Sequence, residues 1–92
     1  MANAKRTGYD IVDGDTIRLK RALNGNKFVR LANVNCPEMN TQAGHRAKQE
    51  LRKVLGGKSI TIDTVGKSYG RNVAVVRAGR KNVNLAMRRK GY

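Results

Sequence analysis

The sequence predicts a mainly β domain with helices, in which five short strands form the sheet, one helix follows the third strand and a short helix comes last. Two observations predict this fold class. Apolar and polar residues alternate in several short runs, which is the pattern of strands with one buried face. After the third run the apolar spacing changes to that of an amphipathic helix.

The first third of the chain is expected to form a three-stranded meander. Residues 1–6 are polar and basic, and we expect them to be a loose arm. Asp-Gly and Asn-Gly pairs favour the tight turns of hairpins, and they occur at Asp13-Gly14-Asp15 and Asn24-Gly25-Asn26. The strands beside these turns are expected over residues 7–13, 16–20 and 27–34.

A helix is expected next, because apolar residues recur at helical spacing and form one stripe: Ala43, Ala47, Leu51, Val54 and Leu55. Asn40 or Thr41 can cap its start, and Gly56-Gly57 ends it. Two further strands are expected over residues 59–65 and 72–77, with a loop at 66–71 between them. A short final helix is marked by Val83, Ala86 and Met87, and it ends at Gly91.

This order of elements matches the five-stranded oligonucleotide-binding (OB) barrel, in which a helix lies between the third and fourth strands. A small α+β sandwich is the alternative fold. With 92 residues, the chain has room for one domain, residues 1–92, with a modest hydrophobic core.

The composition points to a polyanionic partner. Lysine and arginine number 20 against 6 acidic residues, which gives a net charge of +14 and favours DNA or RNA. A membrane is not expected, because no long apolar segment is present. Cys36 is the single cysteine, which excludes an internal disulfide. We expect a monomer. The compartment is left open: cytoplasmic, or secreted or periplasmic if a signal peptide was removed.

Polar residues at strand ends and turns are the candidates for chemistry: Asp13, Asp15, Arg30, Asn35, Glu38, Tyr69 and Arg71. Turns that are distant in sequence can meet at one rim of a barrel. Hard oxygen ligands at such turns suit Ca²⁺. Two arginines can neutralise the charge of an attacked phosphodiester, and a glutamate can orient or deprotonate the attacking water.

Three segments of the sequence resemble the signature blocks of the staphylococcal (micrococcal, thermonuclease-type) nuclease family. They are Ile11-Val12-Asp13-Gly14-Asp15-Thr16, Val29-Arg30-Leu31-Ala32-Asn33-Val34-Asn35-Cys36-Pro37-Glu38 and Tyr69-Gly70-Arg71. Val83-Asn84-Leu85-Ala86 resembles the helix that follows in that family. The blocks stand in the family's order and cover about residues 8–91.

The resemblance implies an OB barrel that hydrolyses DNA and RNA with Ca²⁺ and leaves a 3′-phosphate and a 5′-hydroxyl. It implies that Asp15 and the main-chain carbonyl of Cys36 are metal ligands. Arg30 and Arg71 would clamp the phosphate, and Glu38 would be the general base. Asp13 would be a supporting acid. Lys67 and Tyr69 would contact nucleic acid, although a turn tyrosine can equally cover the barrel edge.

The sequence departs from the family pattern in three places. Asn35-Cys36 stands where the family usually has Asp-Thr, so the expected metal shell loses one negative charge. An Asn35 carbonyl can still bind Ca²⁺, but with lower affinity. Lys67 replaces an acidic residue, and the chain stops at Tyr92, before the family's usual final helix.

Two other functions compete with a nuclease. A catalytically weak or inactive nucleic-acid-binding OB module would explain Asn35 and the high charge. A basic ribosomal or architectural protein would explain the charge, but not the acids at turns beside Arg30. Within the site, Cys36 and His45 could form a nucleophile and its base, yet the sequence offers no third group to orient them. A lone solvated histidine and a half-buried thiol are the simpler interpretation.

Overall fold

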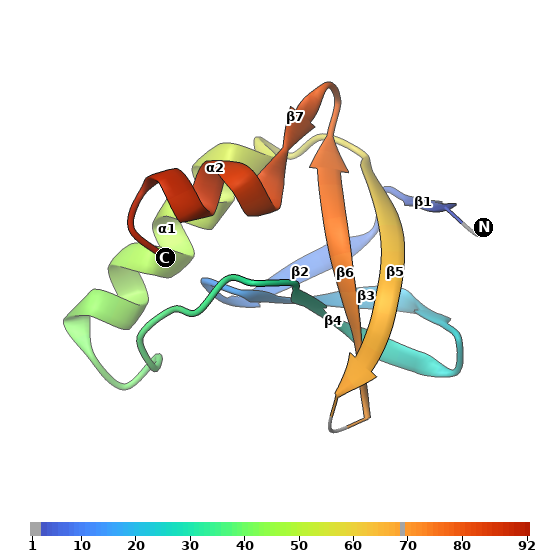
Figure 1. Ribbon diagram of the computed structural model, residues 1–92, viewed down its shortest axis with the longest axis horizontal. Helices are drawn as coiled ribbons and strands as arrows, with labels where there is room; N and C mark the ends of the chain where they lie inside the picture. Colours follow the sequence, from blue (N-terminus) through green and yellow to red (C-terminus); the bar gives the residue numbers. More distant parts are fainter. Residues whose placement is uncertain (1–2, 69) are drawn as a thin grey trace.

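The computed structural model describes residues 3–68 and 70–92 (Figure 1). The elements in this part of the chain are β1 (Asn3–Arg6), β2 (Tyr9–Asp13), β3 (Thr16–Leu23), β4 (Asn26–Leu31), α1 (Gln42–Leu55), β5 (Ile60–Ser68), β6 (Arg71–Ala78), β7 (Lys81–Asn82) and α2 (Val83–Arg89). Neither helix in these residues is long and apolar enough to cross a membrane.

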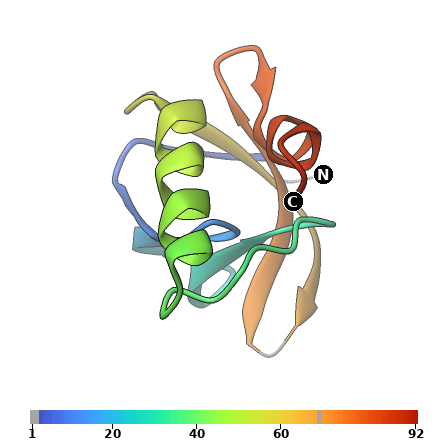
Figure 2. The same ribbon diagram turned by 90° about the vertical axis from the view of Figure 1, so that its left-hand side faces the viewer.

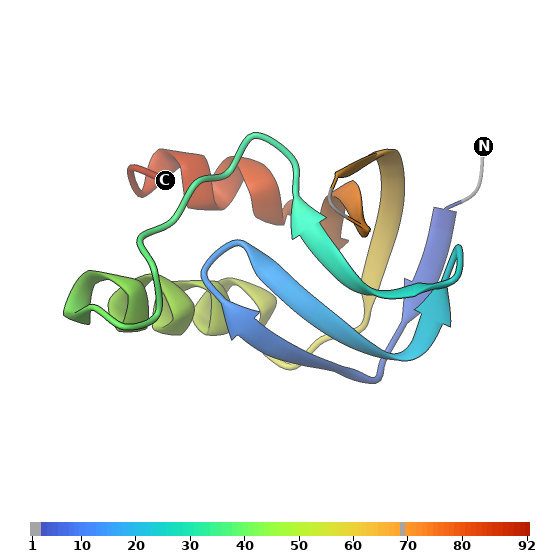
Figure 3. The same cartoon turned by 90° about the horizontal axis from the view of Figure 1, so that it is seen from below.

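The strands form one strongly curled sheet with the order β1-β5-β6-β4-β3-β2, and β7 pairs with β6. All neighbours are antiparallel except β4 and β6, which are parallel. Figures 1 and 3 show β5 and β6 crossing the direction of β2, β3 and β4, so the sheet is a half-barrel. The predicted mainly β, OB-like fold is confirmed, with α1 after the predicted third strand and α2 as the short last helix.

The prediction of five strands is wrong, because the described residues form seven. Residues 3–6, expected to be a loose arm, pair with β5 from Asn3 opposite Asp63 to Arg6 opposite Ile60. This pairing covers the edge of β5, and its main-chain hydrogen bonds need no apolar pattern in the added strand. Lys81 and Asn82 likewise pair with β6, in the segment between the last predicted strand and the predicted final helix.

Several predicted boundaries are also wrong. The strand expected over residues 16–20 continues to Leu23. The strand expected over residues 27–34 ends at Leu31, and Asn33 then adopts a positive φ of 62°, which a β-strand does not allow. The loop expected at residues 66–71 is shorter, because β5 continues to Ser68 and β6 begins at Arg71. The β5–β6 pairing absorbs an irregularity between Thr64 and Gly66.

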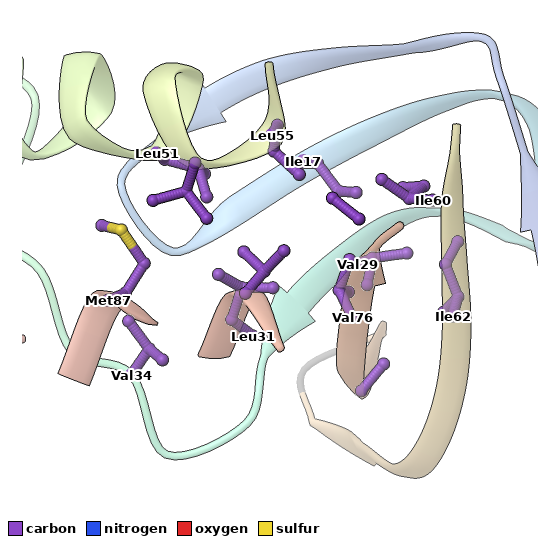
Figure 4. Close-up of a cluster of buried hydrophobic side chains, with 14 of the residues drawn as sticks. Ile17, Val29, Leu31, Val34, Leu51, Leu55, Ile60, Ile62, Val76 and Met87 are labelled. Carbon is purple, nitrogen blue, oxygen red and sulfur yellow. The ribbon is translucent and has the colours of Figure 1, made fainter. Parts of the chain in front are cut away.

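The hydrophobic core lies inside the curl of the sheet, and α1 and α2 cover it (Figures 2 and 4). Alternate residues of each long strand point into it, as the period of a strand requires. Leu51 and Leu55 enter from α1, and Met87 enters from α2. The strand side chains that are fully buried there include Ile17, Leu19, Val29, Leu31, Ile60, Ile62 and Val76.

Both ends of α1 are capped as predicted. The Thr41 hydroxyl accepts the N–H of Gly44 at 2.9 Å, and Gly56 adopts φ 58° at the C-terminal cap. The predicted apolar stripe is buried except at Ala43, which is exposed. Gly44 is buried in its place, because the first turn of α1 packs directly onto the main chain at Glu38.

A buried asparagine fixes α2 to the sheet. Asn84 is 6% exposed, and its Oδ1 accepts the N–H of Val76 at 2.9 Å. Its Nδ2 donates to the carbonyls of Ala32 at 2.9 Å and Ala74 at 3.0 Å. One amide thus satisfies main-chain groups on β6 and on the segment that leaves β4, where the two parallel strands separate.

We predict that Asn84→Ala lowers the free energy of unfolding by about 3 kcal/mol, because it leaves the buried Val76 N–H and Ala32 carbonyl without a partner and removes one of the two donors to the Ala74 carbonyl. Asn82→Ala is the matched comparison: Asn82 caps α2 by accepting the N–H of Leu85, and loss of such a cap costs about 1 kcal/mol. Urea unfolding of both variants measures the difference. Equal stability of the two would contradict the role given to Asn84.

Candidate functional site

The acidic turn between β2 and β3 is held by its own side chains. Asp13 Oδ1 accepts the main-chain N–H of Asp15 at 3.1 Å, and the Thr16 hydroxyl donates to Asp15 Oδ1 at 3.0 Å. Burial raises the pKa of Asp13, and a hydrogen bond with the Asp15 side chain raises it further. The turn therefore presents two neighbouring carboxyl groups, one of which holds its proton more tightly than an ordinary aspartate.

Gly14 is required for close packing and not for its backbone angles. The sequence indicated a glycine with the positive φ of a tight turn, but Gly14 is not among the residues with positive φ. A Cβ there would lie 2.7 Å from both Ala47 Cβ and Cys36 Sγ. Gly14 thus lets α1 and the segment after β4 approach the turn. Gly70, which precedes Arg71, does have a positive φ of 73°.

Asp15 binds the turn to the segment that follows β4. Its main-chain carbonyl accepts the N–H of Leu31 at 2.8 Å, and its Oδ2 accepts the N–H of Cys36 at 3.1 Å. Figure 3 shows the β2–β3 turn lying between α1 and this segment. Two regions about twenty residues apart in sequence are therefore joined through one aspartate.

Arg30 completes the cluster from β4. Its Nη2 lies 2.8 Å from Asn35 Oδ1 and 3.5 Å from Asp15 Oδ2, and its Nη1 donates to the carbonyl of Leu31 at 3.0 Å. The side chains of Arg30 and Asp15 are 23% and 13% exposed. The structure thus brings together four of the residues that the sequence predicted: Asp15, Arg30, Asn35 and Cys36.

Arg71 lies on the same face of the sheet as Arg30. Arg30 is paired with Val73 of β6, and Arg71 is two residues before Val73, so strand alternation gives both arginines the same face. On its other side, Arg30 is paired with Thr16 of β3. Arg71, Thr16 and Asp13 line one open hollow of about 530 Å³. The predicted arginine pair and acidic turn therefore share one side of the molecule.

Glu38 is exposed on the segment between β4 and α1. Its main-chain carbonyl accepts the Thr41 hydroxyl at 2.7 Å, and Gly44 packs against that carbonyl so closely that a Cβ would collide with it. In the described residues no ion pair joins its carboxylate to Arg30. The main chain at Glu38 is therefore fixed while its carboxylate faces solvent.

Of the two remaining predicted residues, Lys67 is not placed with this group. Lys67 is paired with Asn72 and Ser68 with Arg71, so alternation puts Lys67 on the sheet face opposite Arg71. Lys67 is exposed there. Tyr69 lies outside the described residues. Sequence reasoning missed Thr16, although a hydroxyl directly after an acidic turn is a signal that could have identified it.

The oxygens around Arg30 Nη2 form a suitable donor set for a hard cation. Asp15 and Asn35 both direct an oxygen at this one positive group, and carboxylate and amide oxygens are ligands that Ca²⁺ accepts. Among the described residues no three His, Cys, Asp or Glu side chains are placed to hold a metal ion. A cation at this place would therefore depend on the Asn35 amide and on main-chain carbonyls.

Comparison with known proteins identifies relatives. Residues 28–92 match the family model described as staphylococcal nuclease homologue. A protein of Haemophilus influenzae named "Uncharacterized endonuclease" is 34% identical over 82 residues, which cover 88% of this chain and 46% of that protein. "Endonuclease YhcR" of Bacillus subtilis is 34% identical over 98 residues, which cover 89% of this chain and 8% of that protein. The chain spans less than half the length of either relative.

The thiol of Cys36 is a packing group. It lies against Gly14 and close to Ala47, whereas His45 is exposed on α1. Burial raises the pKa of the Cys36 thiol to about 12, and the charges of Asp15 and Asp13 act in the same direction, opposed by Arg30. Since the thiolate is the nucleophilic form, this environment disfavours the alternative in which Cys36 and His45 are a nucleophile and its base.

We predict that iodoacetamide alkylates Cys36 in the folded protein roughly a thousandfold more slowly than in the unfolded chain at pH 8, because the raised pKa suppresses the thiolate. Mass spectrometry of samples quenched over time measures both rates. The chain in guanidinium chloride is the control. Equal rates in the two states would show that the thiol is accessible and ionised.

Proposed function

The chain belongs to the staphylococcal nuclease family, and from this premise and the cluster at Asp15 we propose that it hydrolyses phosphodiester bonds in DNA and RNA. The observation that carries the proposal is the placement of Arg30 and Arg71 on one face beside the acidic turn. A nuclease needs positive groups where the phosphate gains charge, and adjacent strands hold these two arginines in place. The named endonuclease relatives support the same activity.

In the proposed reaction, Arg30 and Arg71 donate hydrogen bonds to the non-bridging oxygens of the phosphate. The Glu38 carboxylate takes a proton from a water molecule, whose oxygen attacks the phosphorus. The bond from phosphorus to the 5′ oxygen breaks, and that oxygen takes a proton from solvent. The products are a 3′-phosphate and a 5′-hydroxyl, as the family resemblance implies.

In the proposed complex, the guanidinium of Arg30 donates both to its partners in the cluster and to the phosphate. Part of its guanidinium already faces Leu31, Asn35 and Asp15, but arginine has five N–H donors, so some remain for a phosphate oxygen. Lysine could not replace it in both contacts, because an ammonium group lacks the planar fork of donors. Its partners in the cluster therefore orient Arg30 before substrate arrives.

We further propose that Ca²⁺ binds at this cluster, with Asp15, the Asn35 amide oxygen and the Cys36 carbonyl as ligands and Asp13 as support. When bound, Ca²⁺ would supply positive charge beside the phosphate. The ligand charge is low because Asn35 is neutral, so millimolar Ca²⁺ should be needed. The Asp15 and Asn35 oxygens that face Arg30 Nη2 support the first two ligands of this proposal.

A second candidate is a nucleic-acid-binding module with little or no hydrolysis. Besides Asn35, a specific surface favours it: an open hollow of about 630 Å³ between α1 and α2, away from the Asp15 cluster. Its lining includes the basic residues Lys53, Arg80, Lys81, Arg89 and Lys90. Such a surface binds a phosphate backbone without cutting it, and its affinity would fall steeply with salt.

We predict that the protein degrades single-stranded DNA at millimolar Ca²⁺ and loses this activity in EDTA. Glu38→Gln should lower kcat by roughly a hundredfold or more, because it removes the proton acceptor. Glu50→Gln makes the same chemical change on α1, where Glu50 pairs with Lys90, and should leave kcat unchanged. Release of acid-soluble nucleotides measures the rates. No turnover by the native protein would defeat the nuclease proposal.

We predict that Asn35→Asp raises the affinity for Ca²⁺ roughly tenfold and increases the cleavage rate, because it adds a negative charge beside Asp15. Gln49→Glu changes the net charge equally on the exposed surface of α1 and should change neither quantity. Calorimetry and the nuclease assay measure both. If Asn35→Asp leaves Ca²⁺ binding unaltered, the cation does not bind at this cluster.

A further inference from the structure

An aromatic side chain is exposed on the sheet face that carries Arg30. Phe28 is 38% exposed, although phenylalanine is normally buried, and its neighbour Val29 is completely buried. Strand alternation places Phe28 on the same face as Arg30, two residues farther along β4. The single phenylalanine of the chain therefore places its ring on the site face and not in the core.

Phe28 lies between two arginines across the sheet. Arg18 of β3 is paired with Phe28 and is exposed. On the other side, Val29 is paired with Asn72 of β6, so the parallel register brings Arg71 beside Phe28. This row of residues from β3, β4 and β6 interleaves an aromatic ring with positive charges, a combination that binds single-stranded nucleic acids.

Phe28 also borders the open hollow that Arg71 lines, beside the proposed phosphate position. Together with Arg71, Thr16 and Asp13 it lines the same open space of about 530 Å³. Its main chain is fixed, because its N–H donates to Asn26 Oδ1 at 2.8 Å and its carbonyl accepts Asn72 Nδ2 at 3.4 Å. The ring is therefore attached to a rigid strand at the border of the site.

We propose that Phe28 is a stacking platform for an unpaired nucleobase next to the phosphate held by Arg30 and Arg71. The proposal deepens the proposed function and rests on it for the position of that phosphate. The face of a base is available for stacking only when the base is outside a duplex. The site would therefore select single-stranded segments, and it would tolerate any base because every base has a π face.

The test is a binding measurement in EDTA, where a Ca²⁺-assisted nuclease does not cut. Fluorescence anisotropy compares a short labelled oligothymidylate with an abasic sugar–phosphate chain of equal length and charge. The native protein should bind the oligothymidylate roughly tenfold more tightly. Phe28→Leu retains an apolar side chain but removes the π face. This variant should lose the preference for the oligothymidylate, while its affinity for the abasic chain stays the same. Phe28→Trp should retain the preference.

Leu85→Ala is the matched control, since Leu85 is another exposed apolar side chain, 45% exposed on α2 beside the basic hollow. An aliphatic side chain has no π face, so its loss should not alter the preference for the oligothymidylate over the abasic chain. Thermal unfolding verifies that each variant is folded. The stacking proposal is overturned if the native protein binds both chains equally. It is also overturned if Phe28→Leu keeps the preference, or if this variant lowers the affinity for both chains alike. The nuclease proposal fails separately, if the protein does not cleave DNA with Ca²⁺, whatever the anisotropy shows.

Discussion

The carboxylate of Asp15 is the contact on which the arrangement of this molecule depends. It accepts the Thr16 hydroxyl and the Cys36 N–H, and it faces the Arg30 guanidinium. Because these groups come from β3, β4 and the segment after β4, one side chain joins three segments at this end of the half-barrel. Hydrogen bonds to a charged carboxylate are stronger than neutral ones, so a small group can hold three segments in place.

Asp13 and Asp15 place two carboxyl groups in one turn of a protein whose net charge is +14. Burial raises the pKa of Asp13, and the neighbouring Asp15 raises it further, so the two carboxyl groups repel each other when both are ionised. Arg30 places a positive charge beside Asp15. A metal ion would do the same, which is why the oxygens that surround Arg30 are also a suitable donor set for Ca²⁺. The same few oxygen atoms therefore hold Arg30 in the structure and form the proposed cation site.

The two faces of the curled sheet carry different side chains, one set for the core and one for the candidate site. Residues such as Ile17, Val29 and Val76 point inward and form the core with α1 and α2. Their neighbours along the same strands, among them Arg18 and Arg30, point outward toward the candidate site. Since the two sets alternate, any shift of register by one residue would exchange them. Asn84 opposes such a shift, because its amide fixes Ala32, Ala74 and Val76 relative to one another.

The local features can be predicted from the sequence alone: the Asn24-Gly25 turn, the Thr41 and Gly56 caps of α1, and the family blocks around Asp15, Arg30 and Arg71. These depend on residues close together in the chain. The folded structure was needed to show that residues 3–6 form a strand, because main-chain pairing requires no side-chain pattern. It also decided that Gly14 serves packing, that Lys67 faces away from Arg71 and that Phe28 lies between Arg18 and Arg71. Each of these follows from the curl and register of the sheet, which bring together segments that no sequence period relates.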